Sequence, residues 1–201
     1  KPDATRIERT VLTAGFRAFN GEMQRLQAAG VRIFGPNASV AQDLEPEYIA
    51  VSDDGRTAWV TLQENNAIAE LDVRNARITD VKPLGFKNHN MAGMGMDPSD
   101  RDSVIKIGPV PVKGMYMPDA IASFQAKGKT WLITANEGDA RAWGENNAAY
   151  WAGDASQGFV EEFRVKHLVH NSGFDRRLPE GDLPPQLRAL AAGAVLNPDV
   201  F

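Results

Sequence analysis

Carboxylates stand close together in the stretch TANEGDAR, Thr134 to Arg141, where Glu137 and Asp139 directly follow an apolar run. A tight turn explains Gly138 and tolerates Asn136, but it requires no acid. Carboxylate oxygens are the ligands that Ca²⁺ prefers, and clustered carboxylates repel one another unless a cation joins them. These residue types therefore predict a cation site, and the alternative is a set of acceptors for neighbouring backbone N–H groups.

Similar acids occur at a second place because the chain contains an internal repeat. The segment PEYIAVSDDGRTAWVTLQEN, Pro46 to Asn65, aligns with PDAIASFQAKGKTWLITANEG, Pro118 to Gly138. Each copy has the pattern of a strand, a turn with glycine, a second strand and an acidic turn. Four acids occupy matching positions, Glu47 with Asp119 and Glu64 with Glu137.

Antiparallel pairing would bring these acids to one end of the two copies, because the first strand starts where the second strand ends. In a propeller, that end is one mouth of the central channel. The predicted Ca²⁺ ligands are Glu47, Glu64, Asp119, Glu137 and Asp139. Arg141 and Lys113 are the predicted counter-charges or phosphate contacts. The alternative is that the acids are only structural acceptors or ion-pair partners.

The elements that position these acids are short β-patterned runs, bounded by Gly, Pro, Asn or Asp. They are YIAVS, TAWVTL, AIAELDV, AIASF, TWLIT and EEFRVKHLV. The run KTWLI, Lys129 to Ile133, is predicted to be a buried strand. Two short helices are predicted, one from Asn20 to Ala29 with Asn20 as its cap and Gly30 as its stop, and one from Pro184 to Gly193.

A repeated antiparallel unit of three or four strands is typical of a β-propeller blade. We therefore predict an all-β fold of antiparallel propeller blades in one domain over 1–201, with repeats at about 46–73 and 118–141. The segments at about 82–117 and 142–158 are predicted to be long inserted loops. Because two blades cannot close a propeller, we predict a partial one, completed by the remainder of the same propeller or by another chain.

Composition excludes several classes of protein. The 201 residues carry a net charge of −4 and no basic run, which argues against a nucleic-acid partner. No apolar run approaches the length of a membrane span. With no cysteine, disulfides and thiolate metal sites are excluded. No serine-hydrolase, zinc-protease or phosphate-loop motif occurs, and His167 and His170 would lie on opposite faces of a strand.

Three long stretches resemble a known family. DLEPEYIAVSDDGRTAWVTLQENNAIAELDV, Asp43 to Val73, and GMYMPDAIASFQAKGKTWLITANEGDAR, Gly114 to Arg141, closely resemble the choice-of-anchor I domain family. The first of these also resembles YVTN-type propeller repeats. AAGVRIFGPNASVAQDLEPEYIAV, Ala28 to Val51, fits the same family, and the resemblance covers the chain well from about Phe16 to Arg141.

The resemblance implies an extracytoplasmic bacterial protein that is periplasmic, secreted or anchored to the cell surface. Some relatives carry an alkaline-phosphatase or phytase-like label. We predict a surface module that binds a partner, glycan or matrix, with calcium in a structural role. The alternative is a metal-dependent phosphoester hydrolase that acts on a phosphorylated small molecule. The absence of a recognisable nucleophile favours the binding module.

Overall fold

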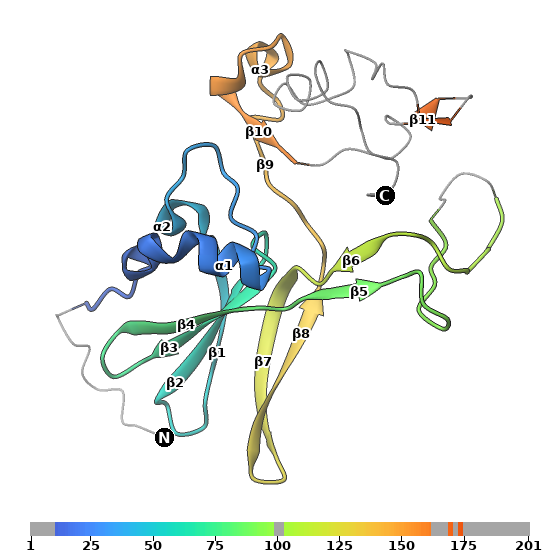
Figure 1. Ribbon diagram of the computed structural model, residues 1–201. Helices are drawn as coiled ribbons and strands as arrows, with labels where there is room; N and C mark the ends of the chain where they lie inside the picture. The colour runs from blue at the N-terminus through green and yellow to red at the C-terminus, as the bar shows by residue number, and fades with distance from the viewer. Residues whose placement is uncertain (1–10, 99–102, 162–168, 171–172, 175–201) are drawn as a thin grey trace. The chain divides into compact units, whose positions relative to one another are not determined.

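A computed structural model describes residues 11–98, 103–161, 169–170 and 173–174 (Figure 1). The chain divides into two compact units. The first comprises Lys1–Lys87 and Gly114–Asp139, and the second comprises Asn88–Lys113 and Ala140–Phe201. The fold is mostly antiparallel β with few helices, as expected for part of a propeller. That the whole chain is a single propeller domain stays a prediction.

The first unit contains a four-stranded antiparallel sheet in the order β1-β2-β3-β4. Its strands are β1 (Pro46–Val51), β2 (Thr57–Leu62), β3 (Ala67–Asp72) and β4 (Arg77–Pro83). The predicted hairpin of the first repeat is confirmed, since β1 and β2 pair from Pro46 opposite Leu62 to Val51 opposite Ala58. Four sequential antiparallel strands are the pattern of one propeller blade.

Strand β4 was not predicted, because its apolar residues do not alternate. Ile78 and Val81 stand three apart, yet both are buried. A β-bulge explains this spacing, since Glu70 lies opposite Asp80 while the next residue, Leu71, lies opposite Ile78. Because β4 extends to Pro83, Lys82 belongs to the sheet and not to an insertion beginning at about residue 82.

The second hairpin of this unit is β7 (Pro118–Ala126) with β8 (Lys129–Asn136), as the repeat predicts. Its turn residues Lys127 and Gly128 have φ values of 51° and 70°, which is the conformation of a tight two-residue hairpin loop. The predicted burial of KTWLI is wrong. Trp131 is 51% exposed and Ile133 is 61% exposed, because nothing among the described residues covers that face of the hairpin.

The two hairpins pack together through their first strands, β1 and β7. Ala50, Ile68 and Ile121 form a small buried cluster, with Trp59, Leu84 and Leu132 packed against it. The Ser123 hydroxyl donates a hydrogen bond of 2.8 Å to the Val51 carbonyl across the same contact. The repeats are therefore neighbours in space, as adjacent blades of a propeller are.

The N-terminal segment packs on the other face of the first sheet (Figure 1). It forms η1 (Arg17–Glu22), α1 (Met23–Ala29) and α2 (Val40–Asp43). The larger core lies here and includes Phe19, Leu26, Val31 and Val40 from this segment and Val60, Leu62, Ala69 and Val81 from the sheet.

The predicted cap of the first helix is wrong, although its end is correct. Asn20 lies in the 3-10 turn before α1, and its side-chain oxygen accepts a hydrogen bond from the Ala41 amide instead of capping its own helix. Gly30 ends α1 in the left-handed conformation with φ of 104°.

The predicted insertions contain short elements of their own. Strand β5 (Phe86–Asn88) pairs with β6 (Lys113–Met115), and β9 (Ala142–Trp143) pairs with β10 (Phe159–Val160). Between the last two lie α3 (Ala148–Trp151) and η2 (Ala155–Gln157). Strands β11 (Val169–His170) and β12 (Gly173–Phe174) also pair. Some predictions lie outside the described residues: the helix from Pro184 to Gly193, the strand placement of His167, and most of the run EEFRVKHLV.

Candidate acidic site

Two of the predicted acids stand at equivalent places at the start of the two hairpins. Glu47 follows Pro46, which lies opposite Leu62, and Asp119 follows Pro118, which lies opposite Asn136. Both strands have a register irregularity directly after that proline. Bulges of this kind change the direction in which a side chain points, and they are frequent beside functional sites.

Two further acids, Glu137 and Asp139, lie in the turn that follows β8. The amides of Glu137 and Gly138 both donate to the Met117 carbonyl, at 3.3 and 3.2 Å, which holds this turn beside the start of β7. The side-chain amide of Gln63 donates a hydrogen bond of 3.2 Å to the Glu137 carboxylate. Because Gln63 directly follows β2, this contact holds Glu137 beside the first hairpin.

The electrostatics of Glu47 show that these acids lie near one another. Partial burial raises the pKa of Glu47, and the negative charges of Asp119, Glu45, Glu137 and Asp139 raise it further, in that order. Four of the five predicted ligands therefore share one field. Glu45 was not predicted, although its position two residues before Glu47 could have suggested it.

These acids lie close enough to affect one another's charge, but their side chains are not arranged as the ligands of a metal ion. Among the described residues, no three His, Cys, Asp or Glu side chains are arranged so that they could hold a metal ion. Glu47 and the four acids that raise its pKa are all exposed. Their side chains can therefore rotate at little cost in packing. The arrangement concentrates negative charge from both hairpins at one end.

Glu64, the fifth predicted ligand, has different surroundings. It lies in the turn between β2 and β3, is half-buried, and its carbonyl accepts a hydrogen bond from the Arg32 side chain. The four carboxylates that raise the pKa of Glu47 do not include Glu64. In the first repeat, the N-terminal segment therefore takes part in contacts at the acidic turn.

The paired asparagines after Glu64 link the first hairpin to its neighbours. Asn66 is fully buried with φ of 49°, a conformation that asparagine tolerates, and its side chain accepts hydrogen bonds from the amides of Tyr116 and Met117. Asn65 donates to the carbonyls of Arg32 and Asp43. Through these contacts, the turn joins the N-terminal segment, the first hairpin and the start of the second. The sequence did not reveal this role because the partners are distant along the chain.

The two predicted cationic contacts belong to the second unit. Arg141 is 6% exposed, and its Nε atom lies 3.9 Å from a Glu161 carboxylate oxygen. The Glu161 amide also donates a 2.9 Å hydrogen bond to the Arg141 carbonyl. Sequence reasoning did not identify Glu161 as the counter-charge. Lys113 is an exposed residue at the start of β6.

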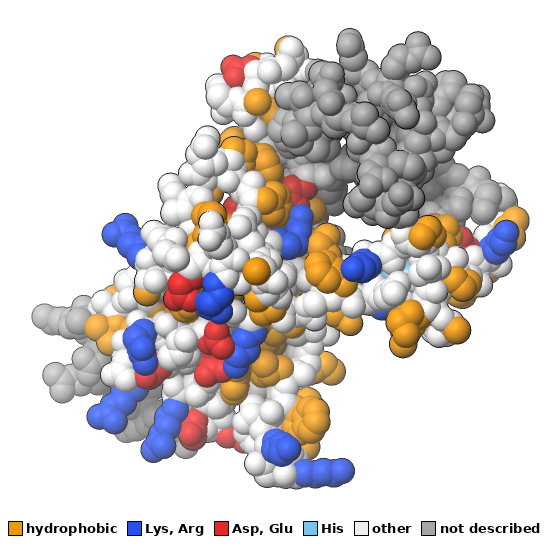
Figure 2. Space-filling view, in the orientation of Figure 1, with side chains coloured by type: hydrophobic (Ala, Val, Ile, Leu, Met, Phe, Trp, Pro, Cys, Tyr) orange, Lys and Arg blue, Asp and Glu red, His pale blue; other side chains and the backbone are white. Residues whose placement is uncertain are grey.

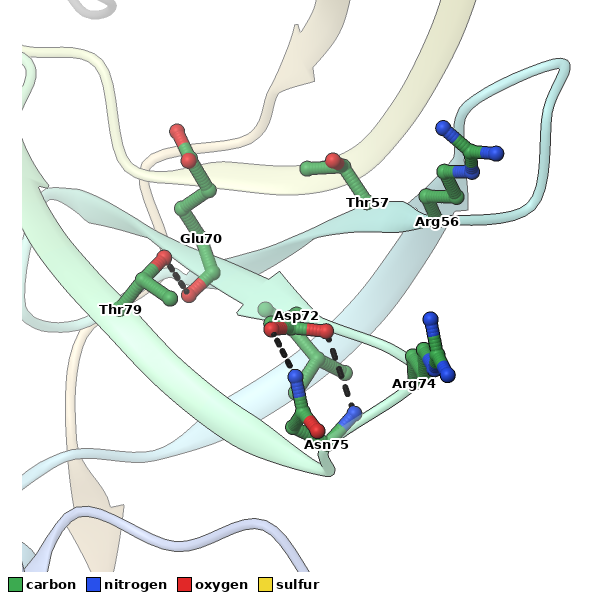
Figure 3. Close-up of a pocket in the computed structure, with 8 residues that line it drawn as sticks. Arg56, Thr57, Glu70, Asp72, Arg74, Asn75 and Thr79 are labelled. Atoms are coloured by element: carbon green, nitrogen blue, oxygen red, sulfur yellow. Dashed lines mark hydrogen bonds between the residues drawn. The ribbon is translucent and has the colours of Figure 1, made fainter.

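A separate cavity of about 450 Å³ lies at the opposite end of the first sheet (Figure 3). Its lining includes Arg56, Thr57, Glu70, Asp72, Arg74 and Asn75. Asp72 accepts hydrogen bonds from the side chain and backbone of Asn75, which hold the pKa of Asp72 below its usual value. Glu70 forms a 3.0 Å ion pair with Lys82. Both carboxylates of this cavity are thus already held by neighbours.

Comparison with known proteins identifies the family of this chain. The sequence model of the choice-of-anchor I domain matches residues 2–192. Neither the curated proteins nor the solved structures contain a match to this chain. None of the helices in the described part of the chain has the length and apolar content that a bilayer span requires.

Proposed function

This chain belongs to the choice-of-anchor I domain family, and on that premise we propose that it is a binding module of a bacterial surface propeller whose acidic end takes up Ca²⁺. The family supports a surface-associated bacterial domain. The binding role and the cation are the parts that we propose. One observation carries them: Glu47 and Asp119 start the two hairpins at equivalent places, and the contact with Gln63 holds Glu137 beside the first hairpin. The raised pKa of Glu47, caused first by partial burial and then by the neighbouring carboxylates, agrees with this placement.

Electrostatic repulsion provides the reason for a cation. The acids come from the start of β1, the start of β7 and the turn after β8, so two hairpins bring like charges together. A divalent cation would remove this repulsion, and exposed carboxylates can rotate to supply the six to eight oxygen ligands that Ca²⁺ takes. Because the site is not preformed, we expect an affinity typical of extracellular modules, on the order of 10⁻⁴–10⁻³ M.

An ion at this place would act in two ways. It would join the first hairpin, through Glu47, to the second, through Asp119 and Glu137. It would also keep coordination positions open to solvent, because the acids are exposed. Hydroxyl or carboxylate groups of a surface ligand such as a glycan could fill those positions.

The test is a calcium titration by calorimetry, together with thermal unfolding in calcium and in chelator. The variant Glu137→Gln keeps an acceptor for Gln63 and removes one charge of the site. We expect it to weaken calcium binding at least about tenfold and to abolish the calcium-dependent rise in unfolding temperature. Asp53→Asn is the matched control, because Asp53 is an exposed acid in the turn between β1 and β2, at the end of the first hairpin that lies away from the acidic site.

Two outcomes would contradict the proposal. Equal calcium-dependent stabilisation in wild type and Glu137→Gln would mean that Glu137 is only an acceptor for Gln63. Calcium-dependent turnover of p-nitrophenyl phosphate would instead support a hydrolase. The binding proposal expects no turnover with or without calcium.

A further inference from the structure

The segment that follows β5 concentrates soft donor atoms in a short length of chain. In HNMAGMGM, His89 to Met96, one imidazole and three thioethers occur together, and these are half of the six methionines of the chain. Thioether sulfur is a soft ligand that selects Cu(I), and imidazole also suits copper. Methionine can equally serve as an apolar packing residue, so the geometry of the segment has to distinguish the two roles.

Backbone hydrogen bonds close this segment into a loop. At one end, the His89 amide donates to the Val112 carbonyl and the Val110 amide donates to the His89 carbonyl, both at 3.1 Å. At the other end, Met96 and Gly108 form an antiparallel bridge with bonds of 3.0 and 3.2 Å. Only one residue separates the partner positions Val110 and Gly108. The chain between His89 and Met96 therefore leaves the pairing as a loop, and its ends lie within about 10 Å of each other.

A turn inside the loop places two of the methionines side by side. The Met94 amide donates a 3.0 Å hydrogen bond to the Met91 carbonyl, and Gly93 between them has φ of 76°, as the third position of a type II turn requires. The first and last Cα atoms of such a turn lie within about 7 Å of each other. A Cβ at Gly95 would overlap the Gly108 carbonyl, so glycine is needed for the close approach beside Met96.

The His89 ring is oriented over the same turn. Its Nδ1 atom lies 2.8 Å from the Met94 carbonyl oxygen. Because a carbonyl oxygen only accepts, Nδ1 carries the proton, and the lone pair of the neutral ring is on Nε2. Histidines that bind metals almost always donate their other ring N–H to a carbonyl or carboxylate in this way. Nε2 is thus the ring atom that can bind a metal ion.

We propose that His89, Met91, Met94 and Met96 bind one Cu(I) ion through Nε2 and the three sulfur atoms. This donor set is neutral and offers no side-chain oxygen, so it does not suit Ca²⁺ or Mg²⁺. It also lacks the thiolates and carboxylates that accompany histidine in zinc sites. The site lies in the second unit and shares no residue with the acidic site, so this inference does not depend on calcium binding.

The methionine side chains can move onto an ion at little cost. Met91 is 56% exposed and Met94 is 45% exposed, and methionine is unbranched with rotatable bonds. Hydrophobic side chains, the class that includes methionine, are visible at the surface over the segment between β5 and β6 in Figure 2. An ion bound by the loop would draw two of these side chains together.

Competition with the chromophoric Cu(I) chelator bicinchoninate tests the proposal, with the full chain under anaerobic conditions and ascorbate present. We expect one Cu(I) per chain to be withheld from the chelator, equally with and without calcium. The double variant Met91→Leu with Met94→Leu keeps the apolar volume and removes two sulfur atoms. It should weaken Cu(I) binding at least about a hundredfold, or about tenfold for each ligand. Met23→Leu is the control, because Met23 belongs to α1.

A third variant separates binding by the ring from its structural contact. His89→Asn retains an amide donor for the Met94 carbonyl and removes Nε2. It should weaken Cu(I) binding at least about tenfold and leave the unfolding temperature without copper unchanged. X-ray absorption at the copper edge should show sulfur scatterers in wild type and fewer of them in the double variant.

A measurement on wild type alone covers the case in which a variant fails to fold. Cu(I) should shift the methyl resonances of Met91, Met94 and Met96 in carbon-proton correlation spectra and leave that of Met23 in place. Three results would overturn the proposal: no Cu(I) withheld from the chelator, unchanged resonances of the loop methionines, or variants that bind Cu(I) as tightly as wild type. The last two would mean that the methionines form only an apolar surface.

Discussion

Hairpins β1–β2 and β7–β8 begin alike and end differently. Each starts with a proline followed by an acid, and each turns at a glycine in the left-handed conformation, with φ of 69° at Gly55 and 70° at Gly128. The first hairpin is extended by β3 and β4 and packed against the N-terminal helices. The second pairs with no further strand among the described residues.

Side chains at matching positions of the two hairpins differ in how much of them is exposed. Val60 of β2 is 5% exposed, whereas Ile133 of β8 is 61% exposed. Local sequence determines that both segments are strands, because β-branched residues and a turn glycine suffice for a hairpin. Burial depends on what other parts of a chain place over the hairpin. Two hairpins with the same sequence pattern can therefore contribute different amounts to the free energy of unfolding.

The largest effect should come from the covered hairpin. Leu62 is fully buried in the larger core, so Leu62→Ala removes apolar contacts and leaves a cavity. We expect a loss of about 3 kcal/mol in the free energy of unfolding, measured with urea. The matched change in the open hairpin, Ile133→Ala, should cost less than about 0.5 kcal/mol for the monomer. Similar losses in both variants would show that the second hairpin is also covered.

The junction between the hairpins should give the next largest effect. Asn66→Ala removes the acceptor for the amides of Tyr116 and Met117 and the donor for the Gly85 carbonyl. Because Met117 is buried, its amide would lose its partner without gaining water, and we expect a cost of about 2 kcal/mol.

An exposed asparagine provides the control for this change. Asn75 donates to Asp72 in the turn between β3 and β4, and Asn75→Ala should cost about 1 kcal/mol or less. Urea unfolding of both variants measures the difference. If Asn66→Ala is no more costly than Asn75→Ala, the two hairpins are not joined through this side chain.

The smallest effect concerns the acidic end that the hairpins share. Since the pKa of Glu47 is raised in the folded protein, its charged form destabilises the fold at neutral pH, and this cost disappears as the pH falls through the folded pKa. Glu47→Gln should therefore be more stable than wild type at pH 7, by less than about 0.5 kcal/mol because water screens an exposed charge. The two proteins should converge in acid. Thermal unfolding across pH measures this, and a variant less stable at pH 7 would contradict the repulsion.

The sequence predicted the parts of the fold that depend on neighbouring residues. The internal repeat located both hairpins, and Gly30 marked the end of α1. The burial of KTWLI was predicted wrongly because an apolar run does not reveal whether another element covers it. Strand β4 was missed because a bulge breaks the alternation between Ile78 and Val81.

The candidate site was predictable to a similar extent. The repeat identified Glu47, Asp119 and Glu137, because matching positions on paired strands must lie at one end. The partner of Arg141 was not predictable, since Glu161 is twenty residues away and reaches it through the pairing of β9 with β10. The contacts of Asn66 with Tyr116 and Met117 span an even longer separation.

Amide hydrogen exchange of the two hairpins at high dilution tests the central comparison most directly. The outward amides of β2 bond to β3, so we expect slow exchange throughout β2. In β8, we expect slow exchange at Trp131 and Ile133, which bond to β7, and fast exchange at Thr130, Leu132 and Thr134. Equal protection of all five β8 amides at dilution would contradict this difference between the hairpins, because it would mean that the second hairpin is completed as the first is.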